Sequence, residues 1–143
     1  MFERILIVCV GNICRSPTAE YVLRHRLGDR ARIGSAGLSA MVGHPVEPTA
    51  LALLREHGID GEAHRARQLD ARLLRESDLV LAMERSHVDA IRRIAPESSG
   101  KVFMMDRWLG GKGIPDPYRQ QRPAFEHVYE LIDESVNSWL PYL

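Results

Sequence analysis

The residues best suited to chemistry lie near the start of the sequence, in the stretch Cys9-Val-Gly-Asn-Ile-Cys-Arg15-Ser16. Cys9 opens this stretch, and Arg15 follows six positions later. An ordinary thiol, with a pKa of about 8.5, is a weak nucleophile at neutral pH, whereas thiols at helix N-termini ionise at about 3.5–7.5. A guanidinium offers a planar fork of donors that can hold two oxygens of a phosphate. The pair therefore predicts a nucleophilic cysteine beside a phosphoryl-binding arginine.

The residues between Cys9 and Arg15 favour a loop that curls around an oxyanion. Gly11 permits a positive φ, and Asn12 is one of the few other residue types that tolerate it. Inward-facing N–H groups, together with the first turn of a following helix, can form an anion nest. The residues expected to contribute backbone to this nest are Val10, Gly11, Asn12, Ile13, Cys14 and Ser16. The Ser16 hydroxyl can also donate to the sulfur and steady a thiolate.

A simpler interpretation treats Cys9 as ordinary packing, since a lone cysteine in a strand is usually buried. The accompanying Gly, Asn and Ser-Pro, between a strand and a helix, favour the phosphate-binding interpretation instead. The sequence contains neither G-x-x-x-x-G-K-[ST] nor G-x-G-x-x-G. Nucleotide binding is therefore poorly supported.

The elements that must position this loop follow from hydrophobic periodicity. The apolar run over 4–10 predicts a strand buried on both faces. Ser16-Pro17 then predicts the N-cap and first residue of a helix that ends before Gly28. Further strands are expected over 32–36, 78–83 and 101–105, and further helices over 48–57, 71–76, 86–95 and 122–140. This alternation predicts an α/β fold, a parallel sheet with helices on both faces and ligands beyond the strands' carboxyl ends.

Length and composition indicate one globular domain over 1–143. The 143 residues are 45% hydrophobic and 27% charged, and the 19 basic and 19 acidic residues cancel. A neutral domain lacks the basic character of nucleic-acid binders, so we expect no nucleic-acid partner. No apolar run approaches the length of a membrane span, so we expect no membrane insertion. Two cysteines are too few for a disulfide framework or a zinc site, which favours a cytoplasmic protein without metal or cofactor.

Four motifs together resemble the low molecular weight protein tyrosine phosphatases over essentially the whole chain. They are C-x5-R-S at Cys9–Ser16, Ser35-Ala36-Gly37, His64-Arg-Ala-Arg-Gln68 and Asp116-Pro117-Tyr118. The bacterial type that works with exopolysaccharide or capsule tyrosine autokinases is the most similar. The resemblance implies a four-stranded parallel sheet of order 2-1-3-4 and a two-step mechanism through a phosphocysteine. It also implies that the substrate is a phosphotyrosine protein, such as an autokinase with a Tyr-rich tail.

Asp116 is the candidate general acid of such a reaction. Tyrosine's phenol has a pKa of about 10, so expelling the phenolate near neutral pH requires a proton donor. Asp116 lies between Pro115 and Pro117, and a residue before proline is held extended, which can aim its carboxyl. The alternative is a rigid turn without chemistry. In the second step the ionised carboxylate would activate water.

The resemblance implies supporting roles for several other residues. Tyr118 would form one wall of the substrate slot, while Asn12 and His64 would hold the loop through hydrogen bonds. Cys14 would form a reversible disulfide with Cys9 under peroxide and so protect it. The respective alternatives for Tyr118, His64 and Cys14 are an ordinary loop aromatic, a structural histidine and a passive buried thiol. Arg119 and Met41 stand where animal members tend to carry aromatics, so clamping of the substrate ring from two sides is not expected.

Three rival functions remain open at this point. Thioredoxin-coupled arsenate reductases share the loop but need further cysteines, and this chain has none beyond Cys14. Arginine phosphatases share it too, but tend to have Thr where this chain has Ile13, which would crowd a guanidinium. A non-enzymatic phosphopeptide-binding module would have no obvious reason to retain Cys9, Arg15 and Asp116.

Overall fold

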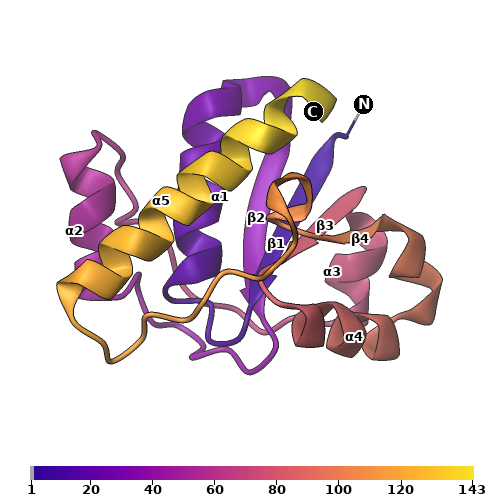
Figure 1. Cartoon of the computed structure of the whole chain (residues 1–143). Coiled ribbons are helices and arrows are strands. Elements are labelled where there is room, and N and C mark those ends of the chain that lie inside the picture. The colour runs from indigo at the N-terminus through magenta and orange to yellow at the C-terminus, as the bar shows by residue number, and fades with distance from the viewer. Residues whose placement is uncertain (1) are drawn as a thin grey trace.

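A four-stranded parallel sheet forms the centre of the molecule in a computed structural model that describes residues 2–143 (Figure 1). The strands are β1 (Arg4–Cys9), β2 (Arg32–Gly37), β3 (Leu79–Ala82) and β4 (Val102–Met104). Their order is β2-β1-β3-β4, and β1 pairs with β2 from Arg4–Arg32 to Cys9–Gly37. The predicted fold class and strand order are confirmed.

Five α-helices cover the two faces of the sheet unequally. They are α1 (Arg15–Leu27), α2 (Pro48–Glu56), α3 (Ala71–Glu76), α4 (Arg85–Ile94) and α5 (Arg122–Trp139). Helices α1, α2 and α5 pack together on one face, and α3 and α4 lie on the other (Figure 1). Among residues 2–143, no helix is both long enough and apolar enough to cross a membrane.

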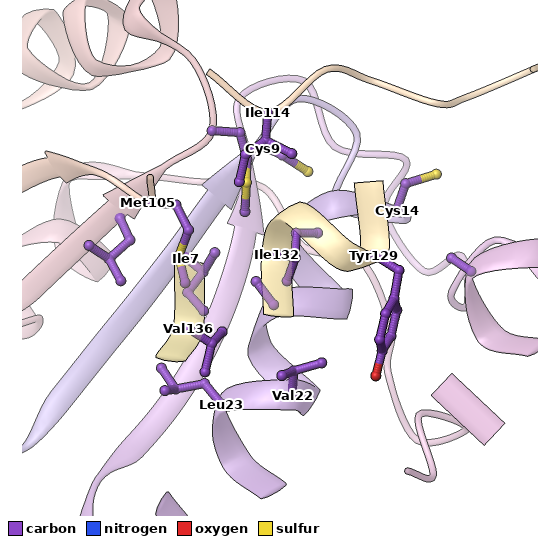
Figure 2. Close-up of a cluster of buried hydrophobic side chains, with 14 of the residues drawn as sticks. Ile7, Cys9, Cys14, Val22, Leu23, Met105, Ile114, Tyr129, Ile132 and Val136 are labelled. Atoms are coloured by element: carbon purple, nitrogen blue, oxygen red, sulfur yellow. The ribbon is translucent and has the colours of Figure 1, made fainter. Parts of the chain in front are cut away.

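Strand β1 joins the two hydrophobic cores because its side chains alternate between the faces of the sheet. Ile5, Ile7 and Cys9 pack toward α1 and α5, whereas Leu6 and Val8 pack on the other side. All five are buried, and full burial of one such aliphatic side chain contributes roughly 1.5–3 kcal/mol. Figure 2 shows the larger core, with both cysteines at its loop end. The end of β1 is therefore a firm base for the loop that follows it.

The outer edge of β2 is covered by side chains and by a short bridge. The Arg24 guanidinium donates to the carbonyl of Ile33 at 2.8 Å, and Arg67 Nε donates to that of Ser35 at 2.9 Å. Gly37 continues this edge by exchanging backbone hydrogen bonds with Arg67 and Leu69. The segment around 67–69 is thus tied to the end of β2, beside the loop after β1.

The boundaries differ from the expectations mainly at the functional loop. Strand β1 ends at Cys9, so Val10 belongs to the loop. Helix α1 begins at Arg15, with Cys14 as its N-cap, and Ser16 is not the predicted cap. The Ser16 hydroxyl instead contacts the Cys9 sulfur and Asn12, which leaves no side-chain cap at this end. A 3₁₀ turn over Pro96–Lys101, which the pattern did not predict, leads into β4.

The C-terminal residues close the structure through aromatic contacts. Trp139 is buried, and its indole N–H donates to the carbonyl of Met105 at 2.8 Å. Tyr142 remains exposed but stacks on Trp108, with 4.4 Å between the ring centres. These contacts fix the start of the long 106–121 segment, which carries Asp116.

Candidate active site

A pocket of about 190 Å³ opens beyond the carboxyl end of β1. It is lined by Cys9, Val10, Gly11, Ile13, Cys14, Arg15, Ser39, Met41, Asp116 and Tyr118. These residues come from the loop after β1, the segment after β2 and the 106–121 segment. The location agrees with the general rule for ligand sites in parallel α/β sheets.

The carbonyl groups of the loop all point outward. The carbonyls of Cys9, Val10 and Gly11 accept from the backbone N–H groups of Leu38, Ser39 and Met41, respectively. The carbonyl of Asn12 accepts from His64 Nε2. Those of Ile13 and Cys14 accept from the N–H groups of Glu47 and Thr18, and all six distances lie within 2.7–3.1 Å. In a trans peptide the N–H points opposite to the preceding carbonyl. The N–H groups of residues 11–15 therefore face inward, and they donate to no atom within residues 2–143. This arrangement is a preformed anion nest.

Asn12 fixes the sharpest bend of the loop. Its φ of 59° is in the left-handed region, which costs roughly 1–2 kcal/mol for a residue with a Cβ. The buried side chain donates to the hydroxyls of Ser16 at 2.8 Å and Ser35 at 2.9 Å, and accepts from the N–H of Arg67 at 2.9 Å. Three hydrogen bonds of roughly 1 kcal/mol each offset that strain.

A chain of hydrogen bonds ends on the Cys9 sulfur. Ser16 Oγ lies 2.9 Å from Cys9 Sγ and accepts a hydrogen bond from Asn12, so its own proton is available to the sulfur. Ser35 is held on the far side of Asn12 by donating to Glu20 Oε1 at 2.5 Å. The chain of hydrogen bonds therefore directs the Ser16 hydroxyl toward the Cys9 sulfur.

The Arg15 side chain is 2% exposed, and acceptors from two other segments hold it. Its Nη1 donates to Glu84 Oε2 at 2.5 Å and to the carbonyl of Ile114 at 2.8 Å. Its Nη2 lies 3.7 Å from Asp116 Oδ2. The guanidinium is thus oriented before any ligand arrives.

Asp116 lies at the pocket mouth with 46% of its side chain exposed. Its Oδ1 accepts from the N–H of Tyr118 at 3.0 Å, which leaves Oδ2 directed toward the Arg15 side of the pocket. Tyr118 lines the rim, and the Arg119 guanidinium lies over its ring, 5.3 Å from the centre. Arg119 itself has a φ of 66°, which turns the chain sharply after the rim.

The structure places the sequence-predicted residues in two groups. Cys9, Arg15, Asp116 and Tyr118 line the pocket, as do Cys14, Ile13 and Met41. Asn12, Ser16 and His64 lie behind the loop and hold it. Burial raises the pKa of the Cys14 thiol, with the carboxylates of Glu47 and Asp116 acting in the same direction.

Sequence reasoning missed Glu84, Glu20 and Arg67. Glu84 lies two residues after the end of β3, so its place at the carboxyl edge of the sheet was an available signal. Glu20 and Arg67 carried no such signal, because their partners Ser35 and Asn12 are distant in the sequence. Residues 2–143 contain no group of three or more His, Cys, Asp or Glu side chains arranged to hold a metal ion.

Comparison of the sequence with known proteins identifies a family that matches it. Residues 4–143 match the family described as low molecular weight phosphotyrosine protein phosphatase. The low molecular weight protein-tyrosine-phosphatase Wzb of Salmonella typhimurium is 49% identical over 97% of this chain and 93% of that protein.

Solved structures agree in fold. Vibrio vulnificus Wzb in complex with benzylphosphonate is 44% identical, covers all of both chains and has a TM-score of 0.96. The YwlE arginine phosphatase of Geobacillus stearothermophilus is more distant in sequence. It is 30% identical over 98% of this chain and 92% of that chain, with a TM-score of 0.91.

We predict that Ser16→Ala slows alkylation of Cys9 by iodoacetamide at pH 6 about tenfold, because a hydrogen bond to a charged group contributes about 1.5–3 kcal/mol. The rate is measured by mass spectrometry of the Cys9 peptide. Ser138→Ala is the matched control, since that hydroxyl donates only to the carbonyl of Ser135 in α5. An unchanged rate in Ser16→Ala would show that the hydroxyl does not stabilise the thiolate.

Proposed function

Since this chain belongs to the low molecular weight phosphotyrosine protein phosphatase family, we propose that Cys9, Arg15 and Asp116 carry out hydrolysis of protein phosphotyrosine through a cysteinyl phosphate. The observation that carries this proposal is the loop from Cys9 to Cys14, whose six carbonyls are tied outward. That loop leaves inward N–H groups around a cysteine and an arginine. Its inner surface is complementary to a tetrahedral phosphate dianion.

In the first step the Cys9 thiolate attacks phosphorus as the bond to the tyrosine oxygen breaks. The loop N–H groups and Arg15 hold the three non-bridging oxygens, and fixed donors of this kind act most strongly on the transition state. Asp116 gives its proton to the leaving phenolate, a contribution typically of about 10²–10⁴-fold. The products are a neutral tyrosine side chain, a phosphocysteine and an ionised Asp116.

In the second step Asp116 accepts a proton from water as the water oxygen attacks phosphorus. The sulfur–phosphorus bond breaks, inorganic phosphate forms, and the Cys9 thiolate is regenerated. The Ser16 hydroxyl, 2.9 Å from the sulfur, stabilises the departing thiolate. The proton taken up by Asp116 restores the acid for the next cycle.

The rim of the pocket supports an aromatic substrate. Tyr118 and Met41 line it, and both offer apolar surface to a phenyl ring. A relative of 44% identity forms a complex with benzylphosphonate. That compound joins a phenyl group to a phosphonate through one methylene group. Resemblance to the Wzb type further supports a tyrosine autokinase with a Tyr-rich tail as the partner, and hence a role in exopolysaccharide production.

The decisive assay measures phosphate release from a phosphotyrosine peptide in the presence of EDTA, with wild type beside Cys9→Ser. We expect metal-independent turnover in wild type and none in the variant, which should still bind orthovanadate because the nest is intact. Phosphoserine and phosphoarginine peptides and a multiply phosphorylated Tyr-rich autokinase tail are run in parallel. The tail should be the best of these substrates.

The other outcomes separate the alternatives. Faster turnover of phosphoarginine than of phosphotyrosine would favour the activity named for the YwlE relative, despite the apolar Ile13 in the pocket. Oxyanion binding without turnover of any substrate would indicate a phosphopeptide-binding module. Equal rates on the tail and on a single-site peptide would remove the argument for an autokinase partner.

The role of Asp116 as acid predicts a loss that depends on the leaving group. Asp116→Asn should lower kcat for phenyl phosphate about 100-fold or more, because the poor leaving group then departs unprotonated. The same variant should lose far less on 2,4-dinitrophenyl phosphate, whose leaving group is stable as an anion. Steady-state kinetics with both esters test this, and equal losses would contradict the assignment.

Cys14 supports a protective redox role, which we also propose. Both thiols are free and both line the same pocket. Burial raises the pKa of Cys14, which keeps its thiol protonated and disfavours direct oxidation of that sulfur by peroxide. Peroxide converts the Cys9 thiolate to a sulfenic acid; attack by the Cys14 sulfur then forms the disulfide and releases water. Such a pair requires a reducing compartment, which supports a cytoplasmic location.

Peroxide treatment tests this role. We expect mass spectrometry to find a Cys9–Cys14 linkage, and dithiothreitol to restore most of the wild-type activity. Cys14→Ser should recover far less, because its Cys9 proceeds to irreversible sulfinic and sulfonic acids. Equal recovery in the two proteins, with no linked peptide, would exclude the role.

A further inference from the structure

Glu84 holds Arg15 from a position where water competes for its carboxylate. Its Oε2 accepts from Arg15 Nη1 at 2.5 Å, yet 42% of the side chain is exposed. Glu84 directly precedes α4, and its side chain makes no capping bond to that helix. A half-exposed carboxylate without another support would readily turn to solvent. A group that keeps the Glu84 carboxylate against Arg15 therefore also affects how Arg15 binds an oxyanion.

His87 lies one helical turn further along α4, directly behind Glu84. Its Nε2 lies 3.6 Å from Glu84 Oε2, and its backbone N–H donates to the carbonyl of Glu84 at 3.0 Å. The imidazole is only 6% exposed. Its Nδ1 is buried and has no hydrogen-bond partner within residues 2–143. A buried ring nitrogen without an acceptor is best left unprotonated, which places the ring proton on Nε2, facing Glu84.

The charges around His87 favour its neutral form. Burial lowers the pKa of His87, and the positive charge of Arg15 on α1 lowers it further. The carboxylates of Glu84, just before α4, and of Asp116, from the 106–121 segment, act in the opposite direction. The net direction is downward from an ordinary value of about 6.5, so the imidazole is neutral at pH 7.

We propose that neutral His87 is a positioning residue for the reaction: its Nε2–H, 3.6 Å from Glu84 Oε2, attracts that carboxylate toward its place against Arg15 and thereby helps to hold the guanidinium ready for the phosphoryl oxygens. This role rests on the proposed function. When His87 takes up a proton below its lowered pKa, it becomes a second cation beside the same carboxylate. Glu84 is then shared between two cations, and its hold on Arg15 weakens.

The test compares His87→Leu, which removes the donor at similar volume, with His87→Gln, which retains an N–H donor. His57→Leu is the matched control, since that exposed imidazole stacks on Tyr129 away from the pocket. The probe is sulfate, whose charge is constant between about pH 5 and 8. Its Kd is measured by calorimetry, and KM and kcat for p-nitrophenyl phosphate, as well as Tm, are recorded for each protein.

At pH 7 we expect His87→Leu to raise the sulfate Kd, and the KM with it, about threefold, because the 3.6 Å contact with Glu84 is weaker than a full hydrogen bond. His87→Gln should recover most of that affinity, and His57→Leu should bind as wild type. The gap between wild type and His87→Leu should narrow as the pH falls through the lowered pKa of His87, because the wild-type imidazole then takes up a proton. A purely structural histidine would lower Tm without changing the sulfate Kd of the folded protein.

Two results would overturn the inference: equal sulfate affinity of wild type and His87→Leu at pH 7, or a gap in sulfate affinity that does not change as the pH falls through the lowered pKa of His87. Failure of the proposed function gives a different result. If wild type turned over no phosphate ester yet bound sulfate, the catalytic assignment would fall. The sulfate comparison would still decide whether His87 positions Arg15.

Discussion

The outward fixing of six consecutive carbonyls is the constraint on which the rest of the site depends. A loop of this length could satisfy its own polar groups in many ways, most of which would turn N–H groups away from the pocket. Here the segment after β2, the side chain of His64 and the first turn of α1 supply the donors to the back of the loop. The N–H groups are thereby committed inward before an anion arrives. Little reorganisation remains for the moment of reaction, which is what makes fixed dipoles effective.

Arg15 links this loop to the opposite half of the sheet. Its guanidinium contacts three acceptors. One is the carboxylate of Glu84, after β3; the other two are the carbonyl of Ile114 and the carboxylate of Asp116, both in the 106–121 segment. The guanidinium proposed to bind phosphate therefore also lies against the candidate acid. Displacement of either segment would disturb both functions at once. The parallel topology makes this possible, since it brings the carboxyl ends of β1 and β3 side by side.

The sequence predicted the parts of the site whose signals are local. Strands such as 4–9 are continuous apolar runs, and Cys9 and Arg15 lie within one short motif, so both could be found by inspection. For Ser16 one of two expectations holds: its hydroxyl contacts the sulfur, as predicted, whereas the N-cap position predicted from the Ser-Pro pair belongs to Cys14. Contacts such as Glu20 to Ser35 and Arg67 to Asn12 depend on tertiary packing, and residue spacing holds no record of them.

The covered edge of β2 has a consequence for how the protein behaves among its own copies. An open edge strand offers a row of unpaired carbonyls onto which a strand of another molecule can add. Because strand residues alternate in direction, the outward carbonyls of β2 are those of Ile33, Ser35 and Gly37. Those of Ile33 and Ser35 each accept from an arginine side chain, and that of Gly37 accepts from the N–H of Leu69. An incoming strand would have to displace two charged groups. The arginines that complete the edge of the sheet thus also oppose strand-by-strand aggregation.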